Sequence, residues 1–110
     1  MVAVRRKNRD KQAVGDATIA PVSVSIADIP QRQLVCVTGK VTRMTARPTS
    51  GQPALAVTVT DDTGTVTAVW TGRRSIGGIT LGRRIAIKGI ATTHGAHLEF
   101  TNPSYTLLPR

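Results

Sequence analysis

The chain has 110 residues, which is enough for one small domain with an adequate core and too few for two. Fifteen Lys and Arg residues outnumber six Asp and Glu, so the formal net charge is +9. This excess destabilises a compact fold by self-repulsion unless an anionic partner binds it, and nucleic acid is the commonest such partner. A membrane surface is not favoured, because the sequence contains no basic amphipathic helix with an apolar face.

The sequence indicates a cytoplasmic protein, associated with the nucleoid if it binds DNA. The basic N-terminal segment is not followed by an apolar stretch of signal-peptide length, and no segment is long and apolar enough to span a bilayer. Cys36 is the single cysteine, so the chain has no internal disulfide and no thiolate metal site. Because Cys36 lies in an apolar run, we predict that it is a small buried core residue.

Residues 1–20 are predicted to be a flexible, disordered basic tail, because they contain five Lys and Arg residues and few apolar ones. The folded domain is expected over residues 21–110. Its first part, residues 21–30, is extended and ends in a short turn at 25–30. Residues 34–44 then form a long strand, rich in Val and Thr, with a bend at Gly39.

Four more strands are expected. After a loop at residues 46–53, residues 55–60 alternate apolar and polar side chains, the turn at 61–64 follows, and residues 65–70 form a third strand antiparallel to the second. Residues 84–92 and 97–101 form the fourth and fifth strands. Four glycines in residues 71–82 disfavour a helix, while Ile76, Ile79 and Leu81 are candidates to close one end of a barrel. Five short strands favour a small barrel over a two-sheet sandwich.

Particular motifs within this pattern resemble those of a known family. They are Asp61-Asp62-Thr63-Gly64, Trp70-Thr71-Gly72-Arg73-Arg74, Ile76-Gly77-Gly78-Ile79, Gly82-Arg83-Arg84 and Asn102-Pro103-Ser104-Tyr105. Together with the bent first strand, they resemble small actinobacterial OB-fold nucleic-acid-binding proteins. The layout over roughly residues 25–108 also resembles the wedge domain of RecG-type branch-migration helicases, which engages branched DNA. The resemblance implies an all-β, five-stranded Greek-key OB-fold barrel, but the chain has no helicase motor and unwinding is not carried over.

OB folds bind oligonucleotides across their second and third strands, between the loop joining strands one and two and the loop joining strands four and five. Guanidinium groups suit this role because they form bidentate hydrogen bonds with phosphate and stack on bases. Trp70 and Tyr105 are candidate stacking residues, although a core or rim position is favoured for Trp70 and a structural role for Tyr105. The predicted nucleic-acid-binding residues are Arg43, Arg47, Thr58, Thr60, Arg73, Arg74, His94 and His97.

We expect no catalysis, no cofactor and no metal site. His94 and His97 have only Glu99 near them, and the Asp61 and Asp62 pair is what a tight turn requires. The predicted function is therefore non-catalytic binding of single-stranded or branched DNA with little sequence specificity. Two alternatives stay open: an RNA-binding module of the tRNA or ribosome class, and a protein-interaction module in a larger assembly.

Overall fold

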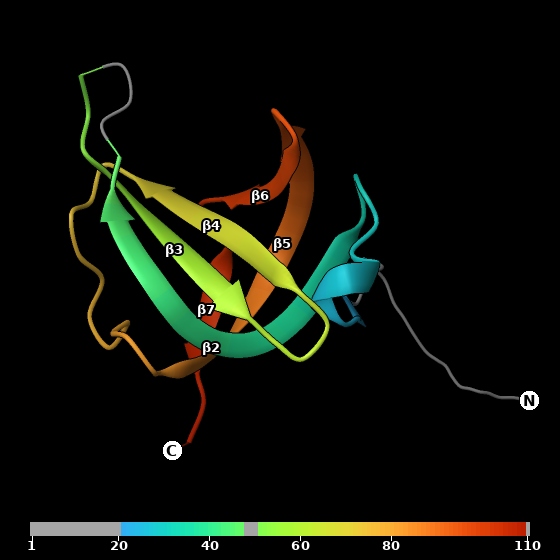
Figure 1. Cartoon of the computed structure of the whole chain (residues 1–110). Coiled ribbons are helices and arrows are strands. Elements are labelled where there is room, and N and C mark those ends of the chain that lie inside the picture. Colours follow the sequence, from blue (N-terminus) through green and yellow to red (C-terminus); the bar gives the residue numbers. More distant parts are fainter. Residues whose placement is uncertain (1–20, 48–50, 110) are drawn as a thin grey trace, which may run out of the picture.

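The computed structural model describes residues 21–47 and 51–109, and the predicted tail at 1–20 lies outside them. All the long elements are strands (Figure 1). The elements are β1 (Val22–Ser23), the 3-10 helix η2 (Ile26–Asp28), β2 (Leu34–Ala46), β3 (Ala54–Thr60), β4 (Thr65–Thr71), β5 (Arg84–His94), β6 (His97–Thr101) and β7 (Ser104–Leu107). No helix in this described part of the chain is long and apolar enough to cross a membrane.

Five of the strands close into a ring in the order β2, β3, β4, β6, β5 and back to β2. The pairings are antiparallel except between β4 and β6, which run parallel. These five strands are the ones predicted from the sequence. Alternation of apolar and polar side chains gives each strand one face for the interior of the ring, as a small barrel requires.

The long strand β2 pairs with β5 over its first half and with β3 over its second half, changing partner at Lys40. The strand curves strongly at this point (Figure 1). Gly39 permits the close approach of β3, because a Cβ atom at this position would lie 2.6 Å from the Thr60 carbonyl oxygen. The bend predicted at Gly39 therefore has a steric cause, which only a residue without a side chain satisfies.

The ring encloses one main core. Phe100, Ile85, Ile87 and the inward valines of β2 and β3 are almost completely buried. Each such side chain contributes about 1.5–3 kcal/mol through burial. Ile76 and Ile79 from the loop after β4 join this core, as predicted, whereas Leu81 is 66% exposed. Leu81 differs because it occupies the tip of a tight turn, closed by a hydrogen bond from the Arg83 N–H to the Thr80 oxygen.

Two further strands were not predicted. β1 pairs parallel with β2, and β7 pairs antiparallel with β5, so both extend the ring on its outer edges. Cys36 was predicted to be buried but is only partly buried. It alternates with the inward Val35 and Val37, so its side chain is directed away from the core.

Candidate nucleic-acid interface

A groove of about 300 Å³ lies on the outer face of β2, β3 and β4. Its position corresponds to the face expected for the ligand, with the loop after β2 on one side and the β5–β6 hairpin beyond it (Figure 1). Three of the predicted residues, Arg43, Arg47 and Thr58, lie together here. The full lining is Arg43, Thr45, Ala46, Arg47, Ala56, Thr58 and Thr67.

Arg43 reaches this face because of a β-bulge. Val41 pairs with Val59 and Arg43 pairs with Thr58, so Thr42 is an extra residue on β2. Without the bulge, strict alternation from Val35, Val37 and Val41 would direct residue 43 into the core. The bulge instead places the Arg43 guanidinium beside the threonines of β3 and β4, and no sequence motif marks it.

Arg47 is held in place by Glu99, a residue that the sequence analysis did not assign to the site. The Arg47 Nη1 atom donates a hydrogen bond to Glu99 Oε2 at 2.8 Å, and Glu99 is only 7% exposed. Glu99 lies on β6, opposite Thr67 of β4 and Thr92 of β5. Glu99 alternates with the inward Leu98 and Phe100, so the sequence predicts that its side chain points outward. The pattern does not predict its partner Arg47, which is 52 residues away.

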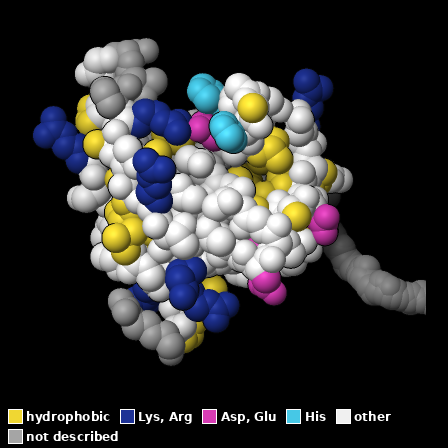
Figure 2. Space-filling view, viewed as in Figure 1, with side chains coloured by type: hydrophobic (Ala, Val, Ile, Leu, Met, Phe, Trp, Pro, Cys, Tyr) yellow, Lys and Arg dark blue, Asp and Glu magenta, His cyan; other side chains and the backbone are white. Residues whose placement is uncertain are grey.

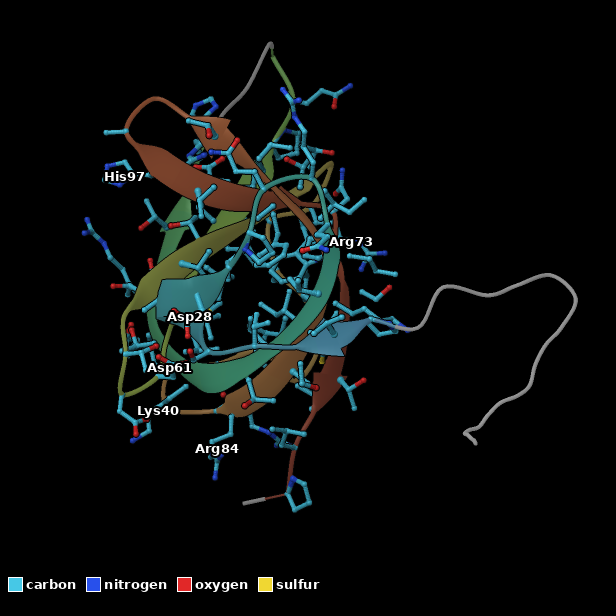
Figure 3. The ribbon with its side chains drawn as sticks, turned by 90° about the vertical axis from the view of Figure 1, so that its right-hand side faces the viewer. Asp28, Lys40, Asp61, Arg73, Arg84 and His97 are labelled. Carbon is cyan, nitrogen blue, oxygen red and sulfur yellow. The ribbon has the colours of Figure 1, made fainter. Side chains whose placement is uncertain are left out.

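Thr60 is not part of the groove. Its hydroxyl lies 3.0 Å from the Thr42 hydroxyl, near the far end of β3. There it lines a separate polar hollow with Lys40, Asp61 and Arg84. Lys40 and Arg84 are directly opposite each other on β2 and β5, at the lower end of the molecule with Asp61 (Figure 3).

Arg73 and Arg74 follow β4 and are exposed. A hydrogen bond from the Gly72 N–H to the Pro53 oxygen, 2.7 Å long, connects this segment to the end of the loop after β2. Arg74 therefore lines a second hollow beside the groove, whereas Arg73 lines neither. Of the two predicted arginines, only Arg74 therefore lies beside the groove.

His94 and His97 pair with each other across the two-residue β5–β6 turn, and both are exposed. Neither lines the groove, but Figure 2 shows His side chains gathered with acidic and basic side chains over the upper part of the same face. In the described residues no group of three or more His, Cys, Asp and Glu side chains is placed to hold a metal ion.

The buried position of Trp70 does not fit the stacking role considered from the sequence. Trp70 is 6% exposed, and its indole N–H donates to the Pro103 oxygen at 3.0 Å. The Tyr105 ring packs edge to face against it, 5.8 Å between ring centres. Asn102 accepts a hydrogen bond from the Thr71 N–H. Trp70 and Thr71, at the end of β4, are therefore hydrogen-bonded to the Asn102-Pro103 segment that connects β6 and β7.

Asp61 organises the β3–β4 turn. Its carboxylate accepts hydrogen bonds from the Thr63 hydroxyl, the Ile26 N–H, the Thr63 N–H and the Gly64 N–H. These bonds, the Thr63 hydroxyl first, lower the pKa of Asp61 from 3.8 to about 2. Asp61 fulfils the role that the turn interpretation gave it, and it also attaches η2 to the turn.

No protein-family model and no curated protein matches this sequence. Solved structures do resemble it. The OB domain of Ta0387 from Thermoplasma acidophilum has a TM-score of 0.62 at 16% identity, covering 78% of this chain and 86% of that one. The second OB-fold domain of replication protein A from Methanococcus maripaludis has a TM-score of 0.64 at 10% identity, covering 81% and 97%.

The structure of yeast Stn1 and Ten1 is also similar, with a TM-score of 0.56 at 10% identity over 70% of this chain and 43% of that one. At such identities the similarity shows the fold alone. Together with the strand order of the ring, it shows that the chain has an OB fold, as the sequence motifs implied.

Proposed function

We propose that this chain is a non-catalytic protein that binds single-stranded or branched DNA in the groove on the outer face of β2, β3 and β4. The observation that carries the proposal is the convergence of Arg43, Arg47 and Thr58 in one groove on that face. OB folds bind oligonucleotides or oligosaccharides there. The positive charge favours the polyanion, because the described residues alone contain nine basic and four acidic side chains.

The contacts available in the groove suit the nucleic-acid backbone. Guanidinium and hydroxyl groups donate hydrogen bonds to phosphate and read little sequence. The resemblance to the RecG-type wedge domain favours DNA over RNA as the ligand. We further propose that the chain belongs to the small actinobacterial OB-fold proteins. The basic residues at 5–11 would add affinity that is independent of sequence.

The test is a binding titration with single-stranded, duplex and forked DNA and with matched single-stranded RNA, at several salt concentrations. If about four phosphates are neutralised, the logarithm of affinity should fall against the logarithm of salt with a slope near −3. Tighter binding of RNA would replace DNA as the ligand. Absence of salt-dependent binding to every nucleic acid would overturn the proposal and favour a protein partner.

A further inference from the structure

A second hollow of about 400 Å³ adjoins the groove and shares Ala46 and Arg47 with it. The two spaces differ in chemistry. The groove presents Arg43 and three threonine hydroxyls, which suit phosphate and sugar. The second hollow instead has apolar walls, and its lining consists of Ala46, Arg47, Gly51, Gln52, Pro53, Ala54 and Arg74.

Nucleotides have the same two-part character, with a charged backbone and a flat, largely apolar base. Single-strand binders usually hold the base by stacking it on aromatic rings. In this chain none of the three aromatic side chains lines the groove or the second hollow. Trp70 and Phe100 are buried, and Tyr105 is packed partly buried against Trp70.

The guanidinium group is the other planar side chain that stacks on bases, and Arg74 is placed to use it. The hydrogen bond from the Gly72 N–H to the Pro53 oxygen holds its segment against the loop after β2. Arg47 stands between the two spaces, with Nη1 bound to Glu99. A backbone in the groove therefore places a neighbouring base over Ala46, Pro53 and Ala54.

We propose that this hollow is a nucleobase subsite, in which an unpaired base stacks on the Arg74 guanidinium above an apolar floor. The inference rests on the proposed function, because it requires a nucleic-acid backbone in the groove. It adds a role for Arg74 that positive charge alone does not supply. A lysine at position 74 would keep the charge and lose the stacking plane.

The experiment compares two single-stranded ligands of about ten nucleotides, within the usual span of one OB fold. One is an intact oligonucleotide, and the other has the same length but consists only of abasic sugar-phosphate units. Each is titrated against the full chain, Arg74→Lys and the matched control Arg84→Lys, which changes an exposed arginine at the start of β5, outside both the hollow and the groove. Circular dichroism checks that all three proteins are folded.

We expect Arg74→Lys to weaken binding of the intact strand by about 5- to 30-fold, as for one lost stacking contact, and to leave binding of the abasic strand unchanged. Arg84→Lys should change neither. An equal loss on both ligands, or no loss on either, would overturn the base subsite while leaving the groove proposal intact. If the unmodified chain binds neither ligand at low salt, the proposed function fails and the subsite fails with it.

Discussion

Charged side chains have different roles at the two ends of β3 and β4: acids stabilise the turn at one end, and arginines line the groove at the other. At the turn end, Asp28 accepts a hydrogen bond from the Ser25 hydroxyl and Asp61 accepts four, so these acids hold the backbone of η2 and of the turn. At the groove end, the arginines have one acidic neighbour, Glu99, among the described residues. Figure 3 shows Asp28 and Asp61 close together at the turn end.

This difference explains how the described part of the chain, with four acidic residues, keeps a basic face. Asp28, Asp61 and Asp62 lie at the turn end, beyond Thr58, which is the groove residue nearest that end of β3. Acids placed there stabilise the turn and repel an anionic ligand in the groove only weakly, because exposed charges more than about 10 Å apart are largely screened at about 0.1 M salt.

The largest effect is expected at Gly39, at the turn end, where β2 changes its pairing partner from β5 to β3. Gly39→Ala places a Cβ atom 2.6 Å from the Thr60 oxygen and 2.7 Å from Val59 Cγ1, so β3 must move. We expect a loss of about 3 kcal/mol in the free energy of unfolding, measured by urea denaturation. Gly77→Ala is the control, because nothing lies within 4 Å of its Cβ position. Equal stability of the two variants would contradict the close approach.

The next prediction compares the loss of one arginine at each end. Arg43→Gln removes a guanidinium from the groove, and Arg84→Gln removes one from the turn end, with the same change in net charge. We expect the first to weaken binding of single-stranded DNA by about 20-fold, as for one lost charge-assisted hydrogen bond, and the second by no more than about threefold. Fluorescence anisotropy measures both. Indistinguishable affinities would show that the groove is not the contact surface.

Glu99→Gln should have a smaller effect, which lowers the stability of the fold but raises its affinity for DNA. Loss of the ion pair to Arg47 should lower the free energy of unfolding by about 1 kcal/mol, because Arg47 is partly exposed and the pair is screened. Removal of the one acidic group that the described residues place next to these arginines should raise affinity for DNA about threefold at low salt. A fall in affinity would indicate that the position of Arg47, rather than the local charge, limits binding.

The smallest expected effect is on stability at low pH, through Asp61 at the turn end. The pKa of Asp61 is about 2 in the folded chain and 3.8 ordinarily, so its stabilising contribution is complete above about pH 5 and is lost as the pH falls through 3.8 toward 2. The melting temperature of Asp61→Asn should therefore approach that of the unmodified chain as the pH falls. Asp62→Asn, at an exposed neighbouring position, should show no such convergence.

Sequence periodicity predicted the five strands of the ring because alternation reports which face of a strand is buried. It missed β1 and β7, which have two and four residues and too few side chains for a pattern. Cys36 was assigned to the core from its apolar neighbours although it has the opposite parity to Val35 and Val37. Leu81 was assigned there without the turn that directs it outward.

The site was predictable only in part, because its geometry depends on pairing between distant strands. Arg43 and Arg47 were selected as residues of the loop joining the first two predicted strands, and Thr58 from the outer face of the second. The three lie together in the structure. Thr60 has the expected parity but lies too far along β3. The bulge at Thr42 and the pairing of Arg47 with Glu99 depend on strand register and on a contact across 52 residues, and neither follows from local pattern.

The closure of the ring has a consequence for the order of folding. Pairing within β2, β3 and β4 joins residues close in sequence, down to Thr60 with Thr65, whereas closure pairs Leu34 with Ile90. The entropy lost in forming the longer loop slows closure. We expect the three-stranded meander that carries the groove to form first. Glu99 then docks onto Arg47 when β6 joins the ring, so we expect this ion pair to break when the ring opens, before the meander unfolds.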